Sequence, residues 1–90
     1  MLQRYLEITY RAGKPLAAYL YLPRRSDDRS AWVEAHGPGY LVDWTEDGRP
    51  IGIEMPSPSL VTVDGLNQVL TELHLEPAAP GEVAPLVAAW

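Results

Sequence analysis

The sequence predicts an α+β fold: a mostly antiparallel five-stranded β-meander, followed by one short helix and a Pro-rich C-terminal tail. Three observations support this class. Residues 1–55 contain five short segments of alternating or β-prone residues, separated by turns rich in glycine, proline and charge. Residues 63–73 carry apolar side chains at helical spacing. Residues 77–90 are rich in proline and alanine.

The first two strands are expected over residues 6–10 and 17–22. Pro23 ends the second strand, because proline cannot donate a hydrogen bond to a neighbouring strand. Alternation along the second strand places Tyr19 and Tyr21 on the face opposite the buried one. The buried set is Ala18, Leu20 and Leu22, and the later strands are expected over residues 31–35, 40–44 and 50–55.

The most specific segment is the hairpin over residues 42–54. Asp47 and Gly48 define its turn, because glycine supplies the positive φ that the end of such a turn requires. A slip of one residue would turn Asp43 toward the core, at the cost of carboxylate desolvation. We therefore expect the register that keeps all apolar side chains on one face, with Val42 opposite Ile51, Tyr40 opposite Ile53 and Trp44 opposite Arg49.

The helix is expected to begin at Thr62, a good N-cap, with Asp64 in the first turn, where negative charge is favourable. Pro77 ends the helical region. We predict one domain over residues 1–76 and a Pro/Ala-rich tail over residues 77–90. The tail is expected to dock on the domain or on a second subunit, because it carries the apolar side chains Val83, Leu86, Val87 and Trp90.

Ninety residues form one small core, which buries roughly 60–65% of the surface that the unfolded chain exposes. Because so small a core gives only a thin margin of stability, we expect a homo-oligomer. The chain has no cysteine, which excludes disulfides and cysteine-ligated metals and suits a reducing cytoplasm. No run approaches the ~18 apolar residues of a membrane span, and the first residues lack a signal-peptide pattern, so we expect a soluble cytoplasmic protein without a membrane partner.

The net charge of −5 is unevenly distributed. Residues 1–30 hold six basic and three acidic groups (+3), whereas residues 31–90 hold one basic and nine acidic groups (−8). This balance argues against nucleic acid as a partner, because phosphate contacts supply most non-specific affinity. A small basic protein is a better match, as a partner, for the negative net charge of the chain. The basic loop of Arg24, Arg25 and Arg29 is neutralised in part by Asp27 and Asp28.

The hairpin resembles the Val-Asp-Tyr-Asp-x-x-Gly-x-x-x-Gly-Ile-Glu hairpin of a bacterial family of small domains of unknown function. The matching positions, over roughly residues 6 to 75, are Tyr10, Tyr19, Leu20, Leu22, Asp43, Gly48, Gly52, Ile53 and Glu54. The chain departs from the pattern at Arg11, Leu16 and Thr45, where the family has acidic residues. The resemblance implies a fold and no activity. Because some relatives resemble the smaller partner of compact RNase-like toxins, it also implies an antitoxin-like role as one alternative.

Large aromatic side chains give the best candidate for an interaction surface, since tyrosine and tryptophan join apolar bulk to a polar group and gather at protein interfaces. The predicted surface consists of Tyr19, Tyr21, Trp32 and Trp90. The favoured function is a non-catalytic protein-interaction or self-associating module, with no catalytic residue, metal or cofactor expected.

An alternative is a metal-dependent or acid/base enzyme that uses Asp43, Glu54 and His36. The predicted register places the two carboxylates at opposite ends of the hairpin, roughly 13 Å apart at ~3.3 Å per residue, which is too far for one ion. This alternative requires both carboxylates and the imidazole to converge in one pocket.

Overall fold

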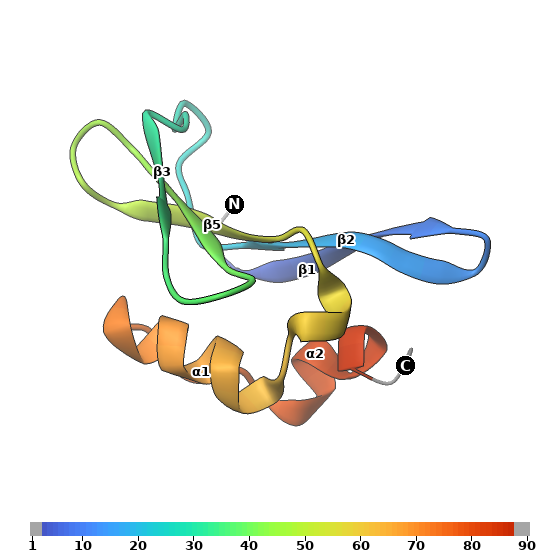
Figure 1. The fold of residues 1–90 in the computed structure, drawn as a ribbon. Coiled ribbons are helices and arrows are strands. Elements are labelled where there is room, and N and C mark those ends of the chain that lie inside the picture. The colour runs from blue at the N-terminus through green and yellow to red at the C-terminus, as the bar shows by residue number, and fades with distance from the viewer. Residues whose placement is uncertain (1–2, 88–90) are drawn as a thin grey trace.

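The computed structural model describes residues 3–87 and shows a five-stranded sheet with two helices packed against one of its faces (Figure 1). The strands are β1 (Tyr5–Arg11), β2 (Lys14–Tyr21), β3 (Trp32–Ala35), β4 (Leu41–Trp44) and β5 (Pro50–Met55). A 3₁₀ helix, η1 (Pro58–Leu60), leads to the helices α1 (Val63–Glu72) and α2 (Pro80–Val87). The predicted α+β class and the five antiparallel strands are confirmed.

The order of the strands in the sheet is β1–β2–β5–β4–β3. The predicted meander, in which neighbours follow chain order, is therefore wrong. After β2 the chain crosses to the far edge and returns, so that β2 to β5 form a Greek key traced in reverse. The apolar side chains of β5, Ile51, Ile53 and Met55, are at most 2% exposed, and a central position buries them better than an edge would. The edge is instead occupied by β3, whose four residues are all exposed.

The β4–β5 hairpin differs in register from the prediction. Val42 lies opposite Ile53 and Asp43 opposite Gly52, a shift of two residues, with a bulge between Asp43 and Trp44. A shift of two leaves every side chain on its predicted face, because the period of a strand is two. The shift arises in the turn, where the Thr45 and Arg49 backbones are joined by a 2.9 Å hydrogen bond and Gly48 has a φ of 86°, as its role in the turn predicts.

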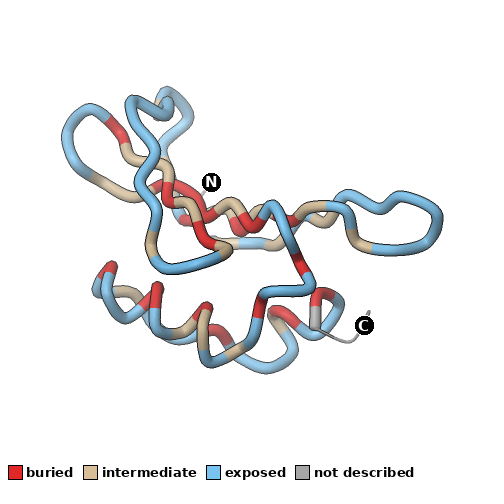
Figure 2. Tube along the Cα trace, viewed as in Figure 1, coloured by how far each residue is buried: buried red, intermediate tan, exposed pale blue. Residues whose placement is uncertain are grey.

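The core lies between the sheet and the helices (Figure 2). The predicted inward residues of β2 are confirmed: Ala18, Leu20 and Leu22 are at most 4% exposed. Thr62 caps α1 as predicted, since its side chain accepts a 2.9 Å hydrogen bond from the Gly65 amide. The buried residues that α1 contributes are Leu66, Val69 and Leu70.

The C-terminal segment contains a second helix, α2, so the prediction of a single helix is wrong. Pro80 stands at the first position of α2, where its missing N–H leaves no hydrogen bond unmade. Val83 and Leu86 are buried in the same core as the sheet. Arg4 fastens this helix to the start of β1, because its guanidinium pairs with the Glu82 carboxylate at 2.5 Å.

Candidate functional site

The two helices cover one face of the sheet, and in the described part of the chain neither covers the other face, here called the outer face (Figure 1). Pairing across the strands places outer-face residues in two parallel rows. One row is Tyr5, Tyr21, Gly52, Asp43 and Val33, and the other is Glu7, Tyr19, Glu54, Leu41 and Ala35. The outer face therefore combines tyrosines with carboxylates.

Tyr19 is fixed by contacts with Gly52 and Asp43. Its ring lies flat on Gly52, where an added Cβ would come within 1.9 Å of the Tyr19 hydroxyl oxygen. The hydroxyl donates a 2.5 Å hydrogen bond to Asp43, whose other oxygen accepts one from Ser30 at 3.1 Å. Burial, followed by the hydrogen bond to Asp43, raises the pKa of Tyr19 to about 12. Asp43 is thus engaged in positioning Tyr19.

The other tyrosines of the outer face form a stack. The Tyr5 and Tyr21 rings lie 4.5 Å apart between centroids and are nearly parallel, and Tyr19 lies 4.6 Å from Tyr21. The Arg24 guanidinium is 5.1 Å from the centre of the Tyr21 ring and donates a hydrogen bond to the Ile51 carbonyl. Tyr5 remains 47% exposed, so the stack offers an accessible aromatic surface at one edge of the sheet.

Glu7 and Glu54 lie on either side of Tyr19 in the sheet register. Two strand spacings separate them, or roughly 10 Å. Because the Tyr19 side chain leans across Gly52 toward Asp43, it leaves the row that joins the two glutamates. Within residues 3–87 neither glutamate forms an ion pair, and the Tyr21 hydroxyl makes only a long hydrogen bond of 3.4 Å to Glu7.

The observed register also corrects the predicted separation of Asp43 and Glu54. Glu54 lies opposite Leu41 and Asp43 opposite Gly52, so the two acids are diagonal neighbours, with Cα atoms roughly 7–8 Å apart rather than at opposite ends of the hairpin. Asp43 nonetheless hydrogen-bonds to Tyr19 and Ser30, whereas no side-chain hydrogen bond of Glu54 is present among the described residues. The pair shares a face without sharing a partner.

His36 lies on the helix side of the sheet. Its Nε2 is 2.7 Å from a Glu34 oxygen and its Nδ1 is 3.1 Å from a Glu72 oxygen, so it connects the end of β3 to the end of α1. The hydrogen bonds to Glu72 and then Glu34 raise the pKa of His36. The structure therefore does not bring His36 together with Asp43 and Glu54. Among residues 3–87 no three histidine, aspartate or glutamate side chains are placed to hold a metal ion.

Trp32 does not share a face with Tyr19 and Tyr21. It lies opposite Trp44 across β3 and β4, on the helix side, with the two ring centroids 6.2 Å apart. Alternation along β3 determines this side, and Trp32 is 45% exposed there. Trp90 lies outside the described residues. Among the described residues the predicted interaction surface is thus divided, because Tyr19 and Tyr21 lie on the outer face and Trp32 lies on the helix side.

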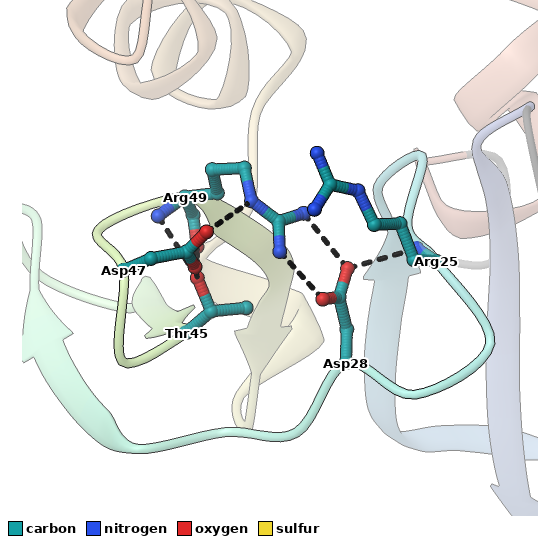
Figure 3. A network of polar contacts seen from close by, with 5 residues as sticks. All are labelled: Arg25, Asp28, Thr45, Asp47 and Arg49. Carbon is teal, nitrogen blue, oxygen red and sulfur yellow. Dashed lines mark hydrogen bonds and ion pairs between the residues drawn. The ribbon is translucent and has the colours of Figure 1, made fainter.

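A polar network joins the basic loop to the β4–β5 turn (Figure 3). Arg49 donates two hydrogen bonds to Asp28, at 2.6 and 2.9 Å, and one to Asp47 at 3.1 Å. The Arg49 hydrogen bonds, together with the Arg25 amide, hold the pKa of Asp28 well below its usual range. Arg49 is the only lysine or arginine between positions 31 and 90. This isolation is the sequence feature that could have indicated the Arg49 network. An open cavity of about 550 Å³ beside the network is lined by Arg25, Asp27, Asp28, Arg29, Thr45, Glu46, Asp47 and Arg49.

Residues 3–87 thus form an α+β domain in which helices cover one face of the sheet and leave the outer face open. Comparison with family models, curated proteins and solved structures gave no match to this chain. None of the helices in the described range has the length and apolar character needed to cross a bilayer.

Proposed function

We propose that this chain is a non-catalytic protein-interaction module that binds a positively charged segment of a partner on its outer face. The observation that supports this function is the pair Glu7 and Glu54, which flanks the tyrosine stack and lacks a cation within the described chain. Carboxylates bind arginine and lysine through charge-assisted hydrogen bonds, and tyrosine rings attract the same cations. The outer face thus offers both kinds of contact to one ligand.

The overall charge supports a basic partner. A net charge of −5 attracts cationic surfaces over distances beyond direct contact, and this attraction increases the rate of encounter. Tyr5 adds accessible aromatic area at the same place. Tyrosine is frequent among the residues that dominate binding energy at interfaces.

The other candidate residues favour binding over catalysis. Asp43 is held by Tyr19 and Ser30 on the outer face, and His36 is held by two glutamates on the helix face. A general acid and a general base must both reach one bound substrate, and two groups on opposite faces of a sheet cannot do so.

The test is an NMR titration of the ¹⁵N-labelled protein with a hexalysine peptide at low salt. We expect the largest shift changes at residues 5–7, 19–21 and 54, and about tenfold weaker binding for the Glu7→Gln/Glu54→Gln variant. Glu46→Gln/Glu76→Gln is the matched control, because it removes the same two negative charges from exposed acids off the outer face. Shift changes centred on the helices, or an equal loss of affinity in the control variant, would contradict the proposal.

A further inference from the structure

The β1–β2 hairpin extends beyond the rest of the sheet as an arm (Figure 1). β5 pairs with β2 only from Ala18 to Tyr21, so the part of the ribbon over residues 9–16 has two strands and no third. Apart from Pro15, all residues of this part are exposed. An isolated two-stranded ribbon is marginally stable in water, so an arm of this kind gains from a surface that packs against it.

The tip of the arm is basic. Arg11 lies opposite Lys14 across a tight turn in which Ala12 and Gly13 both have positive φ. Neither cation forms an ion pair or a side-chain hydrogen bond with any other residue of the described range. Within residues 3–87, a basic pair on the arm and an acidic pair on the outer face, Glu7 and Glu54, therefore both lack ion pairs.

We propose that the partner of the outer face is the arm of a second copy of this chain, an inference that rests on the proposed function. Glu7 and Arg11 are four residues apart on β1, or roughly 13 Å. A twofold axis across the ribbon at Thr9 and Ala17 brings Arg11 over Glu7 of the second copy, and it brings Lys14 within reach of the second copy's Glu54. The same two contacts recur on the other side of the axis, because a twofold interface is self-complementary.

The residues at the axis permit this packing. Thr9 and Ala17 lie opposite each other, and their short side chains allow two sheets to approach to the usual spacing of about 10 Å. The overlap is a ribbon roughly 23 Å long and two to three strands wide. It would bury a few hundred Å² of surface on each copy, which is below the ~800 Å² per partner of a standard interface. The dimer is therefore expected to be weak, with a Kd on the order of 100 µM, and to depend on salt.

The test is sedimentation velocity of the full chain from about 10 µM to about 1 mM, at roughly 50 and 500 mM salt. Wild type is expected to dimerise at high concentration and low salt. The reversed variants Arg11→Glu/Lys14→Glu and Glu7→Lys/Glu54→Lys are each expected to associate at least about tenfold more weakly. An equimolar mixture of the two variants should dimerise again, because each acidic tip then meets a basic face and each basic tip an acidic face.

Glu46→Lys/Glu76→Lys is the matched control for Glu7→Lys/Glu54→Lys, with the same change in net charge at two exposed acids off the outer face. Circular dichroism melting checks that each variant is folded. If Arg11→Glu/Lys14→Glu does not fold, Arg11→Gln/Lys14→Gln takes its place. Strictly monomeric wild type, or failure of the mixture to associate, would overturn the second copy as partner. Hexalysine binding at Glu7 and Glu54 would then still support the proposed function, whereas loss of both results would remove both proposals.

Discussion

The two faces of the sheet are built from different chemistry. On the helix face, Leu20, Val42 and Ile53 have no exposed surface and pack against α1 and α2. On the outer face, Tyr19 and Tyr21 are held by directional contacts: a hydrogen bond to Asp43, ring stacking and the Arg24 cation.

This difference separates stability from recognition. Buried aliphatic side chains stabilise the fold in proportion to the area removed from water. Hydrogen bonds and ring contacts at a partly solvated face contribute less each, but they fix where a hydroxyl or a ring lies. Removing side-chain atoms from the helix face should therefore reduce stability, whereas removing a hydroxyl or a charge from the outer face should chiefly change the chemistry of a binding surface.

The largest effect is expected at the centre of the helix face. Leu20→Ala removes a fully buried side chain and should lower the free energy of unfolding by about 3 kcal/mol, from lost burial and the cavity left behind. Tyr21→Phe, one residue further on the same strand, should change it by less than about 1 kcal/mol. Urea unfolding measures both values, and equal losses would show that the two faces do not differ in this way.

The next effect concerns the contact between Gly52 and Tyr19. Gly52→Ala places a Cβ within 1.9 Å of the Tyr19 hydroxyl oxygen, so the ring must move and its bond to Asp43 must break. We expect a loss of about 2 kcal/mol. In a Tyr19→Ala background the same substitution should cost much less, because the clash is gone. Similar costs in the two backgrounds, measured by urea unfolding, would indicate that Tyr19 does not lie on Gly52.

Sequence patterns predicted the local features of this fold well. Alternation assigned Ala18, Leu20 and Leu22 to the core, and turn and capping chemistry placed Gly48 and Thr62. These features depend on a few neighbouring residues. The β2–β5 pairing joins residues 31 to 37 positions apart and has no local signal, so chain order suggested a meander instead.

The candidate site was harder to predict, for two physical reasons. A register shift of two residues leaves the faces unchanged, so apolar patterning could not show that Asp43 and Glu54 are diagonal neighbours. The face of Trp32 depends on which residue begins β3, and sequence patterns place such boundaries poorly. Gly52 did carry a usable signal, because a glycine within a strand often marks a close approach by another group.

A smaller effect concerns the Tyr19 hydroxyl. Its pKa of about 12 should make it titrate above an ordinary tyrosine near ~10, and Tyr19→Phe should remove that late step. Asp43→Asn should lower the Tyr19 pKa, because a neutral amide no longer opposes the phenolate. The Asp43→Asn substitution should also lower the free energy of unfolding by about 1 kcal/mol. Phenolate absorbance during a pH titration measures the step. An unchanged late step in Tyr19→Phe would assign it to another tyrosine.

The smallest effect is expected on the helix face, where His36 joins β3 to α1. Its raised pKa means that the charged form is stabilised by Glu72 and Glu34 in the folded protein. This contribution is complete below the unfolded-state value of about 6.5 and is lost as pH rises through the higher folded-state value. Because both glutamates are largely exposed, we expect less than about 1 kcal/mol.

The urea midpoint should thus fall between about pH 6 and pH 9 in wild type more than in His36→Gln. Glu72→Gln should reduce the slope, since Glu72 is the larger cause of the raised pKa. Glu76→Gln removes an exposed acid that has no contact to His36 in the described chain, and it should retain the slope. A steeper fall in His36→Gln than in wild type would mean that the neutral imidazole is the form bound more strongly in the fold.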